Sequence, residues 1–241
     1  MDKDKKDITP GIEEYLEALF HLQEEGKAVS TKALAEKLSL KPASVSEMVK
    51  KLAALKLVRH KPYRGVTLTK NGQKAAASLV RRHRLSERFL ADMLGVPWDE
   101  LHDEACKFEH VISDKVEEKL LEALGDPETC PHGNPIPTAD GKVSEQAAVP
   151  LSRFGPGESG VIAKITEEKP EFLQYLASLG MLPDVSVQVQ EVAPFGGPII
   201  IKIRCGSYAI GRDIAGHIYL KPSSAVRLHE KHQQSHQRNQ R

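Results

Sequence analysis

The sequence predicts an α+β protein with an N-terminal winged helix-turn-helix, an all-α segment and a small C-terminal β-barrel. Three patterns indicate this fold class. Apolar residues follow a helical period near the N-terminus, the period changes to strand–turn–strand around residues 57–69, and residues 151–228 form short β-like runs between turn residues. With 241 residues, the chain has room for a main body and one small appended domain.

Three helices are expected before residue 57. The first ends near Gly26, and its apolar residues recur at the spacing of one helix face; they are Ile12, Tyr15, Leu16, Leu19 and Phe20. Ser30 and Thr31 form an N-cap pair for the second helix. Pro42 fits the first turn of the third helix, whose buried stripe is Val45, Met48, Val49 and Leu52.

Beyond the strand–turn–strand segment, Thr69 can cap a long helix from about Lys70 to Leu94. Two shorter helices are expected around residues 98–108, continuing towards His110, and 111–124. The Pro- and Gly-rich stretch 125–150 reads as an ordered turn followed by a linker. The expected parts are a winged helix-turn-helix domain at 1–75, a helical domain at 76–140, a linker at 141–150, a β domain at 151–228 with one helical stretch at 170–179, and a disordered tail at 229–241.

Several classes of protein are excluded by composition. No apolar run approaches the roughly 18 residues of a membrane span, so no membrane partner is expected. The charged N-terminus has no apolar core and is not a secretory signal. Three widely spaced cysteines do not suggest a disulfide framework, which favours a cytoplasmic protein.

Charge is unevenly distributed along the chain. Twelve Lys/Arg and two acids lie between Lys27 and Lys74, a net charge of +10, whereas seven Lys/Arg and twelve acids lie between Ala76 and Pro127, a net charge of −5. A basic block suits a polyanionic partner, and an acidic block that carries histidines suits a cation.

The basic block has the layout of a DNA reader. A recognition helix presents short polar and basic side chains to the major groove, and wing residues meet phosphates. The candidate DNA-binding residues are Ser44, Ser46 and Lys50 on the helix and Arg59, Lys61 and Arg64 on the wing. Glu47 lies outward on the same helix and argues mildly against DNA, although a carboxylate can accept a hydrogen bond from a cytosine amino group. The alternative is an ordinary helical protein whose lysines are only solvated.

The acidic block has the spacing of a metal site. Cys106, Glu109 and His110 stand at i, i+3 and i+4, so one helix face would offer S, O and N donors. This mixture suits Fe(II), Mn(II), Co(II), Ni(II) or Zn(II). His83 and Glu87 form an i, i+4 pair that His102 could join. Each residue alone has an ordinary structural explanation, and the spacing is not that of a zinc protease.

The sequence resembles the diphtheria-toxin-repressor family of iron- and manganese-dependent regulators. The resemblance runs from about Ile12 to Leu220. It is carried by EEYLEALFHL, ASVSEMVKKL, YRGVTLTKNG, RRHRLSERFL, HDEACKFEHVISD and CPHGNPIP, in which Cys130 is interpreted as a turn residue. The C-terminal part resembles the SH3-like domain of that family, which is also akin to the ferrous-transport accessory fold.

The resemblance implies a homodimer in which a metal joins the first helix to the later helices and orders the DNA-binding form. It implies a primary metal site of Glu14, Cys106, Glu109 and His110, with Glu17 as a further candidate ligand. It implies an ancillary site of His83, Glu87, His102, Glu168 and Glu171. The helices from about Trp98 to Leu124 would form much of the dimer contact.

The metal-binding residues combine features of two branches of the family. Iron-type members carry a methionine in place of Glu14, and manganese-type members carry carboxylates in place of both Glu14 and Cys106. The softer Cys106 ligand favours Fe(II), whereas Glu14 and Glu17 favour Mn(II). We favour Fe(II) slightly, with Zn(II), Co(II) or Ni(II) as ions that could bind in vitro.

The expected function is therefore a metal-dependent transcriptional repressor that binds palindromic operator DNA as a homodimer and regulates metal homeostasis, and not an enzyme. Two alternatives remain. A metal-dependent hydrolase would use the His/Glu/Cys cluster but needs an open coordination position and a positioned base. A metal-buffering adaptor acting through the SH3-like domain would bind metal without sequence-selective DNA affinity.

Overall fold

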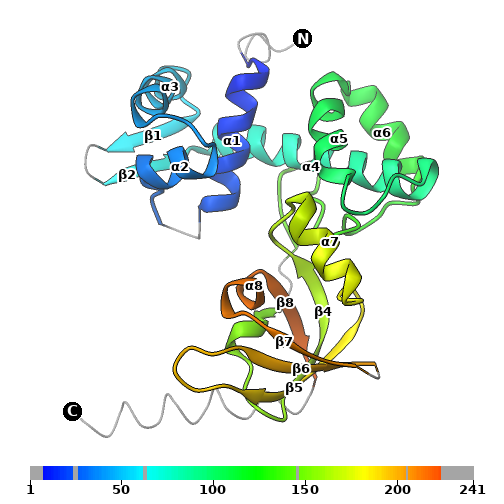
Figure 1. The fold of residues 1–241 in the computed structure, drawn as a ribbon. Helices are drawn as coiled ribbons and strands as arrows, with labels where there is room; N and C mark the ends of the chain where they lie inside the picture. The colour runs from blue at the N-terminus through cyan, green and yellow to red at the C-terminus, as the bar shows by residue number, and fades with distance from the viewer. Residues whose placement is uncertain (1–7, 24–26, 62–63, 145–146, 205, 224–241) are drawn as a thin grey trace, which may run out of the picture. The chain divides into compact units, whose positions relative to one another are not determined.

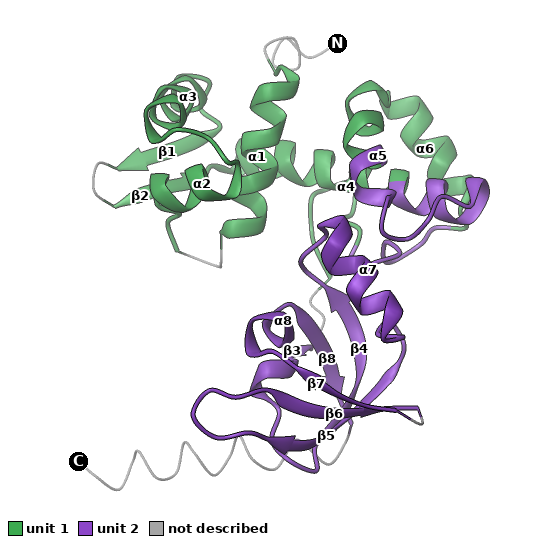
Figure 2. Ribbon diagram, in the orientation of Figure 1, with its two compact units in different colours: residues 1–86, 105–125, 136–144 green, residues 87–104, 126–135, 145–241 purple. Residues whose placement is uncertain are grey.

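The computed structural model describes residues 8–23, 27–61, 64–144, 147–204 and 206–223. It contains two compact units (Figure 2). Unit 1 comprises residues 1–86, 105–125 and 136–144, and unit 2 comprises residues 87–104, 126–135 and 145–241. The predicted tail at 229–241 lies outside the described residues. The predicted domain borders remain a prediction, because the two units divide the helical segment and the linker between them.

Unit 1 begins with the elements of a winged helix-turn-helix (Figure 1). They are α1 (Pro10–Leu22), α2 (Thr31–Lys37), α3 (Pro42–Ala54) and the antiparallel hairpin of β1 (Val58–Lys61) and β2 (Gly65–Leu68). The side chain of Ser30 caps α2 by accepting a hydrogen bond from the backbone N–H of Ala33 at 3.0 Å. The helical and strand patterns of the sequence are confirmed here.

One apolar core holds these elements together. The inward face of α1 packs against residues of α2, α3 and β2, all in one buried cluster. Its fully buried members include Ile12, Leu16, Leu19, Leu34, Val45, Val49, Leu52 and Val66. The wing is also fastened to α1, because the side-chain oxygen of Gln23 accepts a hydrogen bond from the backbone N–H of Leu68 at 2.8 Å.

The long helix α4 (Lys70–Leu94) starts at Thr69, as the sequence predicts. The Thr69 hydroxyl accepts from the backbone N–H of Gly72 at 3.0 Å and donates to the carbonyl of Lys56 at 2.7 Å. Residues up to Ser86 belong to unit 1, and the rest of α4 belongs to unit 2.

The helix that carries Cys106 is shorter than predicted. It forms α5 (Leu101–Phe108), and residues Glu109–Val111 form the 3₁₀ turn η2 instead of continuing it. A new helix, α6 (Asp114–Ala123), begins after Ser113, whose hydroxyl accepts from the backbone N–H of Val116 at 3.3 Å. This new N-cap restarts the helical register, so the i, i+3, i+4 argument for one continuous face does not hold as written.

Unit 2 contains an antiparallel sheet with the strand order β3-β8-β4-β5-β6-β7. Its elements are β3 (Val149–Pro150), η3 (Leu151–Arg153), β4 (Ser159–Ile165), α7 (Pro170–Ser178), β5 (Ser186–Val192), β6 (Ile199–Ile203), β7 (Gly206–Ile210), α8 (Arg212–Gly216) and β8 (Ile218–Pro222). Irregularities at Ile162/Lys164 and Val189/Glu191 interrupt the strand register. The buried core lies between the sheet and α7, which confirms the predicted C-terminal β domain.

A sharp turn at residues 130–134 is fastened to β4 within this unit. The backbone N–H of Ile165 donates to the carbonyl of His132 at 2.9 Å, and the Asn134 side chain donates to the carbonyl of Ile165 at 2.9 Å. Gly133 has φ +83, and a Cβ added there would collide with the carbonyl of Ala163. Only glycine suits this position, because the backbone is left-handed and the strand is too close.

We predict that Gly133→Ala destabilises unit 2 by about 3 kcal/mol or more, the combined effect of a left-handed alanine and overpacking. Gly157→Ala is the matched control, because Gly157 has φ +84 but has open space around it, and it should cost only about 1 kcal/mol. Urea unfolding followed by the fluorescence of Trp98, the single tryptophan, measures both. Equal losses would show that the turn is not tightly packed on β4.

No helix in the described ranges has the length and apolar character needed to cross a membrane.

Candidate metal centres and nucleic-acid interface

The first cluster of ligand-type side chains lies in unit 1. One carboxylate oxygen of Glu17 on α1, one ring nitrogen of His83 on α4 and one carboxylate oxygen of Glu109 on η2 all lie within 4.8 Å of one another. His83 Nδ1 and Glu109 Oε2 lie 2.6 Å apart. Three separate elements therefore meet at one small polar site.

Three further residues surround this cluster. His110 places Nδ1 2.7 Å from Oε2 of Glu13 and Nε2 3.5 Å from Oε1 of Glu109. A ring nitrogen of His83 and Sγ of Cys106 lie within 4.8 Å. Of the predicted primary ligands, Cys106, Glu109 and His110 are thus close to the cluster.

The surroundings of Glu109 make the ionised form of its carboxyl group unfavourable. Its side chain is almost fully buried, and this burial raises the pKa of its carboxyl group. The hydrogen bond with His83 lowers the same pKa, and the nearby carboxylate of Glu17 raises it. Carboxylates, imidazoles and a thiol crowded together in this way form a donor set that fits a divalent transition-metal ion.

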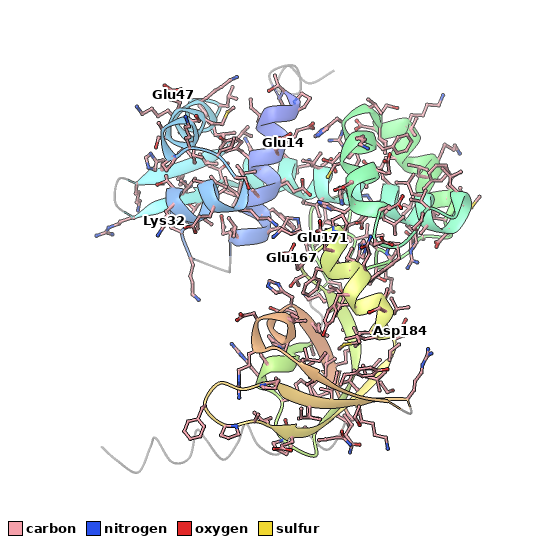
Figure 3. All side chains as sticks on the ribbon, viewed as in Figure 1. Glu14, Lys32, Glu47, Glu167, Glu171 and Asp184 are labelled. Carbon is pink, nitrogen blue, oxygen red and sulfur yellow. The ribbon has the colours of Figure 1, made fainter. Side chains whose placement is uncertain are left out.

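The structure does not bring Glu14 to this cluster. Glu14 is exposed on α1 (Figure 3), while Glu13 and Glu17, one turn apart, lie on the side that meets His110 and Glu109. The reason is helical phase: the buried face of α1 is fixed by its apolar residues, and successive residues are rotated by about 100°. Glu17, which the resemblance implies only as a further candidate ligand, is the α1 residue that lies within 4.8 Å of His83 and Glu109.

The second cluster lies in unit 2 and is more deeply buried. One ligand atom each from Glu87, Cys130, His132 and Glu168 lies within 4.8 Å of the others. Glu87, Cys130 and His132 are each at most 1% exposed. His132 Nδ1 lies 3.1 Å from Oε1 of Glu87 and 3.9 Å from Oε1 of Glu168.

Side chains around Glu168 hold its carboxylate in place. Oε2 lies 3.0 Å from Nδ1 of His102, and Oε1 accepts a hydrogen bond from Nδ2 of Asn134 at 2.9 Å. Three predicted ancillary residues, Glu87, His102 and Glu168, therefore gather in unit 2. Glu171 is exposed in the first turn of α7 and is outside the ligand groups found among the described residues (Figure 3).

Sequence reasoning missed Cys130 and His132. Both were read as part of a turn in CPHGNPIP, and that turn aims them at Glu87 and Glu168, which are distant in the sequence. The sequence signal that could have identified them is the spacing of Cys130 and His132, two residues apart, followed by Gly133, where only glycine fits. Their partners come from α4 and from the loop between β4 and α7, so no local spacing could reveal them.

Both missed residues hold protons tightly. Burial alone would lower the pKa of His132, but hydrogen bonds with Cys130 and Glu87, together with the charge of Glu87, raise it to about 11. Burial raises the pKa of the Cys130 thiol. Metal ligation requires a neutral imidazole and a thiolate, so a metal ion must displace these protons.

The predicted DNA-binding residues share unit 1. Ser44 and Lys50 on α3 are exposed, as are Arg59, Lys61 and Arg64 on the wing. Ser46 is only partly exposed, and its hydroxyl donates to the carbonyl of Pro42 at 2.8 Å. This geometry leaves the basic side chains accessible to a polyanion.

A winged helix-turn-helix that shares a helix with a carboxylate–imidazole cluster defines the class of metal-responsive DNA-binding proteins. Three family models match the chain: the N-terminal DNA-binding domain of iron-dependent repressors at residues 7–66, their metal-binding and dimerisation domain at residues 69–138, and the FeoA domain at residues 149–222. The chain therefore belongs to the iron-dependent repressor family, which includes the diphtheria toxin repressor. It is a metal-dependent transcriptional repressor and not an enzyme.

Individual relatives agree with this membership. The chain is 35% identical over 207 residues to the iron-dependent repressor IdeR of Mycobacterium leprae, covering 81% of this chain and 90% of that protein. It is 39% identical over 150 residues to the diphtheria toxin repressor of Corynebacterium diphtheriae, covering 61% and 66%. Among solved structures, a manganese-dependent transcriptional repressor in complex with manganese matches with a TM-score of 0.82 and 38% identity, covering 88% of this chain and 100% of that one.

We predict that metal binding to the unit 2 cluster releases protons. Because the raised pKa values of His132 and Cys130 keep both groups protonated near neutral pH, metal affinity should rise with pH and fall as acid is added. Calorimetric titration with Zn(II) in buffers of different ionisation enthalpy measures the protons released. Cys130→Ser should reduce the number, and a wild-type protein that releases none would contradict the assignment.

Proposed function

We propose that this protein represses transcription by binding a palindromic operator as a homodimer when it is loaded with Fe(II) or Mn(II). One observation carries the proposal: a single helix, α1, contributes to both the winged-helix core and the unit 1 cluster. Ile12, Leu16 and Leu19 fix α1 in the core, while Glu13 and Glu17 reach the cluster. Because α1 belongs to both the cluster and the core, an interaction that restrains the cluster also restrains α3 and the wing.

The residues of the cluster explain why metal would matter. Without an added cation, the carboxylates of Glu17 and Glu109 repel each other in poorly solvated surroundings. A bound divalent ion would add positive charge beside these carboxylates, which already contact the imidazoles of His21 and His83. Glu17 then holds α1 against His83 and Glu109, and this arrangement is favoured only by the ion's differential affinity for it.

A homodimer gives the operator its symmetry. Val111 and Val116 are 74% and 45% exposed in unit 1, within the segment 98–124 that the resemblance assigns to the dimer contact. Two winged helices related by a two-fold axis would read two half-sites, and the preferred DNA would be a palindrome. A repressor of this kind would act in the cytoplasm, where the operator lies.

The unit 2 cluster is proposed as an ancillary metal site. It keeps Glu87, His102 and Glu168 from the expected set and adds Cys130 and His132. His83 is assigned to the unit 1 cluster, and Glu171 is left out because it is exposed.

Fe(II) is proposed as the physiological ion in preference to Mn(II). Sγ of Cys106 lies close to His83, and a thiolate is a softer ligand than a carboxylate and is better matched to Fe(II). The carboxylates of Glu17 and Glu109 are compatible with either ion.

Glu17→Gln should raise the metal concentration needed for half-maximal operator binding by at least about tenfold, because it removes a charged ligand without changing shape. Glu14→Gln makes the same change on the same helix at an exposed position and should have little effect. Fluorescence anisotropy of a labelled operator, titrated with Mn(II), measures both. Operator binding that is equally strong in the presence of a chelator would contradict the proposed function. A larger effect of Glu14→Gln than of Glu17→Gln would show that Glu14 is a metal ligand.

Replacing the thiol should change the choice of ion. Cys106→Asp exchanges a soft ligand for a hard one, so anaerobic titrations should show weaker activation by Fe(II) relative to Mn(II), with the ratio shifted by about tenfold. Cys130→Asp is the comparison at the unit 2 cluster and should leave this ratio unchanged for operator binding. Identical ratios in wild type and Cys106→Asp would show that Cys106 does not select the ion.

A further inference from the structure

The exposed face of α3 carries one acid. Its buried residues, Val45, Val49 and Leu52, fix which side faces outward, and Glu47 lies on that outward side between Ser44 and Lys50 (Figure 3). A carboxylate in this position would face the most negative partner available, since the helix is the expected reader of DNA. General attraction to phosphates cannot explain it, because the charge has the wrong sign.

Glu47 is also not engaged within the protein. The other acid of the basic block, Glu36, lies 3.7 Å from Lys32 in an i, i+4 ion pair on α2. Lys50 and Lys51 are one turn beyond Glu47, yet Glu47 has no hydrogen bond or ion pair among the described residues. Its carboxylate is therefore available to an external donor.

The hydrogen-bonding groups on the base edges in the major groove limit which base can supply that donor. A carboxylate only accepts hydrogen bonds, and the groove edges of guanine and thymine present acceptors that would repel it. Adenine presents a donor next to the N7 acceptor, whereas cytosine presents its N4 amino group as a donor with no acceptor beside it. Cytosine is the base that fits best.

We propose that Glu47 reads a cytosine in each operator half-site and so determines base preference at one symmetric position. The proposal rests on the proposed DNA-binding function. Ser46 is less suited to this role than Glu47, because its side chain is only partly exposed and its hydroxyl is turned back towards the carbonyl of Pro42. Glu47 thus offsets its repulsion from phosphates by a charge-assisted hydrogen bond that only the preferred sequence provides.

The test is selection from a randomised duplex library with Mn(II)-loaded wild type, Glu47→Gln and Glu36→Gln. Glutamine offers one donor and one acceptor and matches adenine, so Glu47→Gln should exchange a cytosine for an adenine at one position per half-site. Binding to the two matched duplexes should change by about tenfold in opposite directions. Glu36→Gln removes the same charge from the same basic block and should strengthen binding without changing any base preference.

The outcomes separate the two proposals. If wild type selects a palindrome and Glu47→Gln selects the same bases with the same relative affinities, the inference about Glu47 is overturned while the repressor function stands. If Glu36→Gln and Glu47→Gln change preference alike, the effect is general electrostatics and the inference again fails. If wild type selects no sequence at all, the proposed function fails with it.

Discussion

The two-sided burial of α1 is the constraint on which the rest of unit 1 depends. Ile12, Leu16 and Leu19 are at most 1% exposed, and burying each such side chain contributes about 1.5–3 kcal/mol. The helix therefore cannot leave the winged-helix core without large cost. Glu13 and Glu17, on another side of the same helix, are committed to a polar cluster with His110, His83 and Glu109. A change in the position of Glu13 or Glu17 at the cluster therefore affects the whole DNA-binding part of unit 1.

The two clusters solve the problem of buried charge in different ways. In unit 1, carboxylates from α1 and η2 meet with imidazoles, burial raises the pKa of Glu109, and the positive charge of Arg82 lies beside Glu13. In unit 2, His132 itself carries a positive charge beside Glu87, and its proton must leave before an ion can be bound. This difference suits a responsive site in unit 1 and a more permanent, structurally supported site in unit 2.

Local patterns in the sequence were sufficient for most of the helices and strands, but not for the two clusters of ligand-type residues. The caps at Ser30 and Thr69 and the apolar stripes of α1 and α3 depend only on neighbouring residues, and they are confirmed. Helical phase separates Glu14 from Glu13 and Glu17, because one residue beyond Glu13 the side chain is rotated by about 100° and faces solvent. Cys130 and His132 were missed because a turn brings them to Glu87 and Glu168, and such long-range contacts leave no periodic signal.

Hydrogen exchange of the full chain, with and without Mn(II), tests the shared role of α1 most directly. We predict that the ion slows exchange of the backbone amides of α1 together with those of α4 near His83, and that the slowing in α1 is lost in Glu17→Gln. Protection confined to α4 and α5, with α1 exchanging at the same rate in both states, would contradict it.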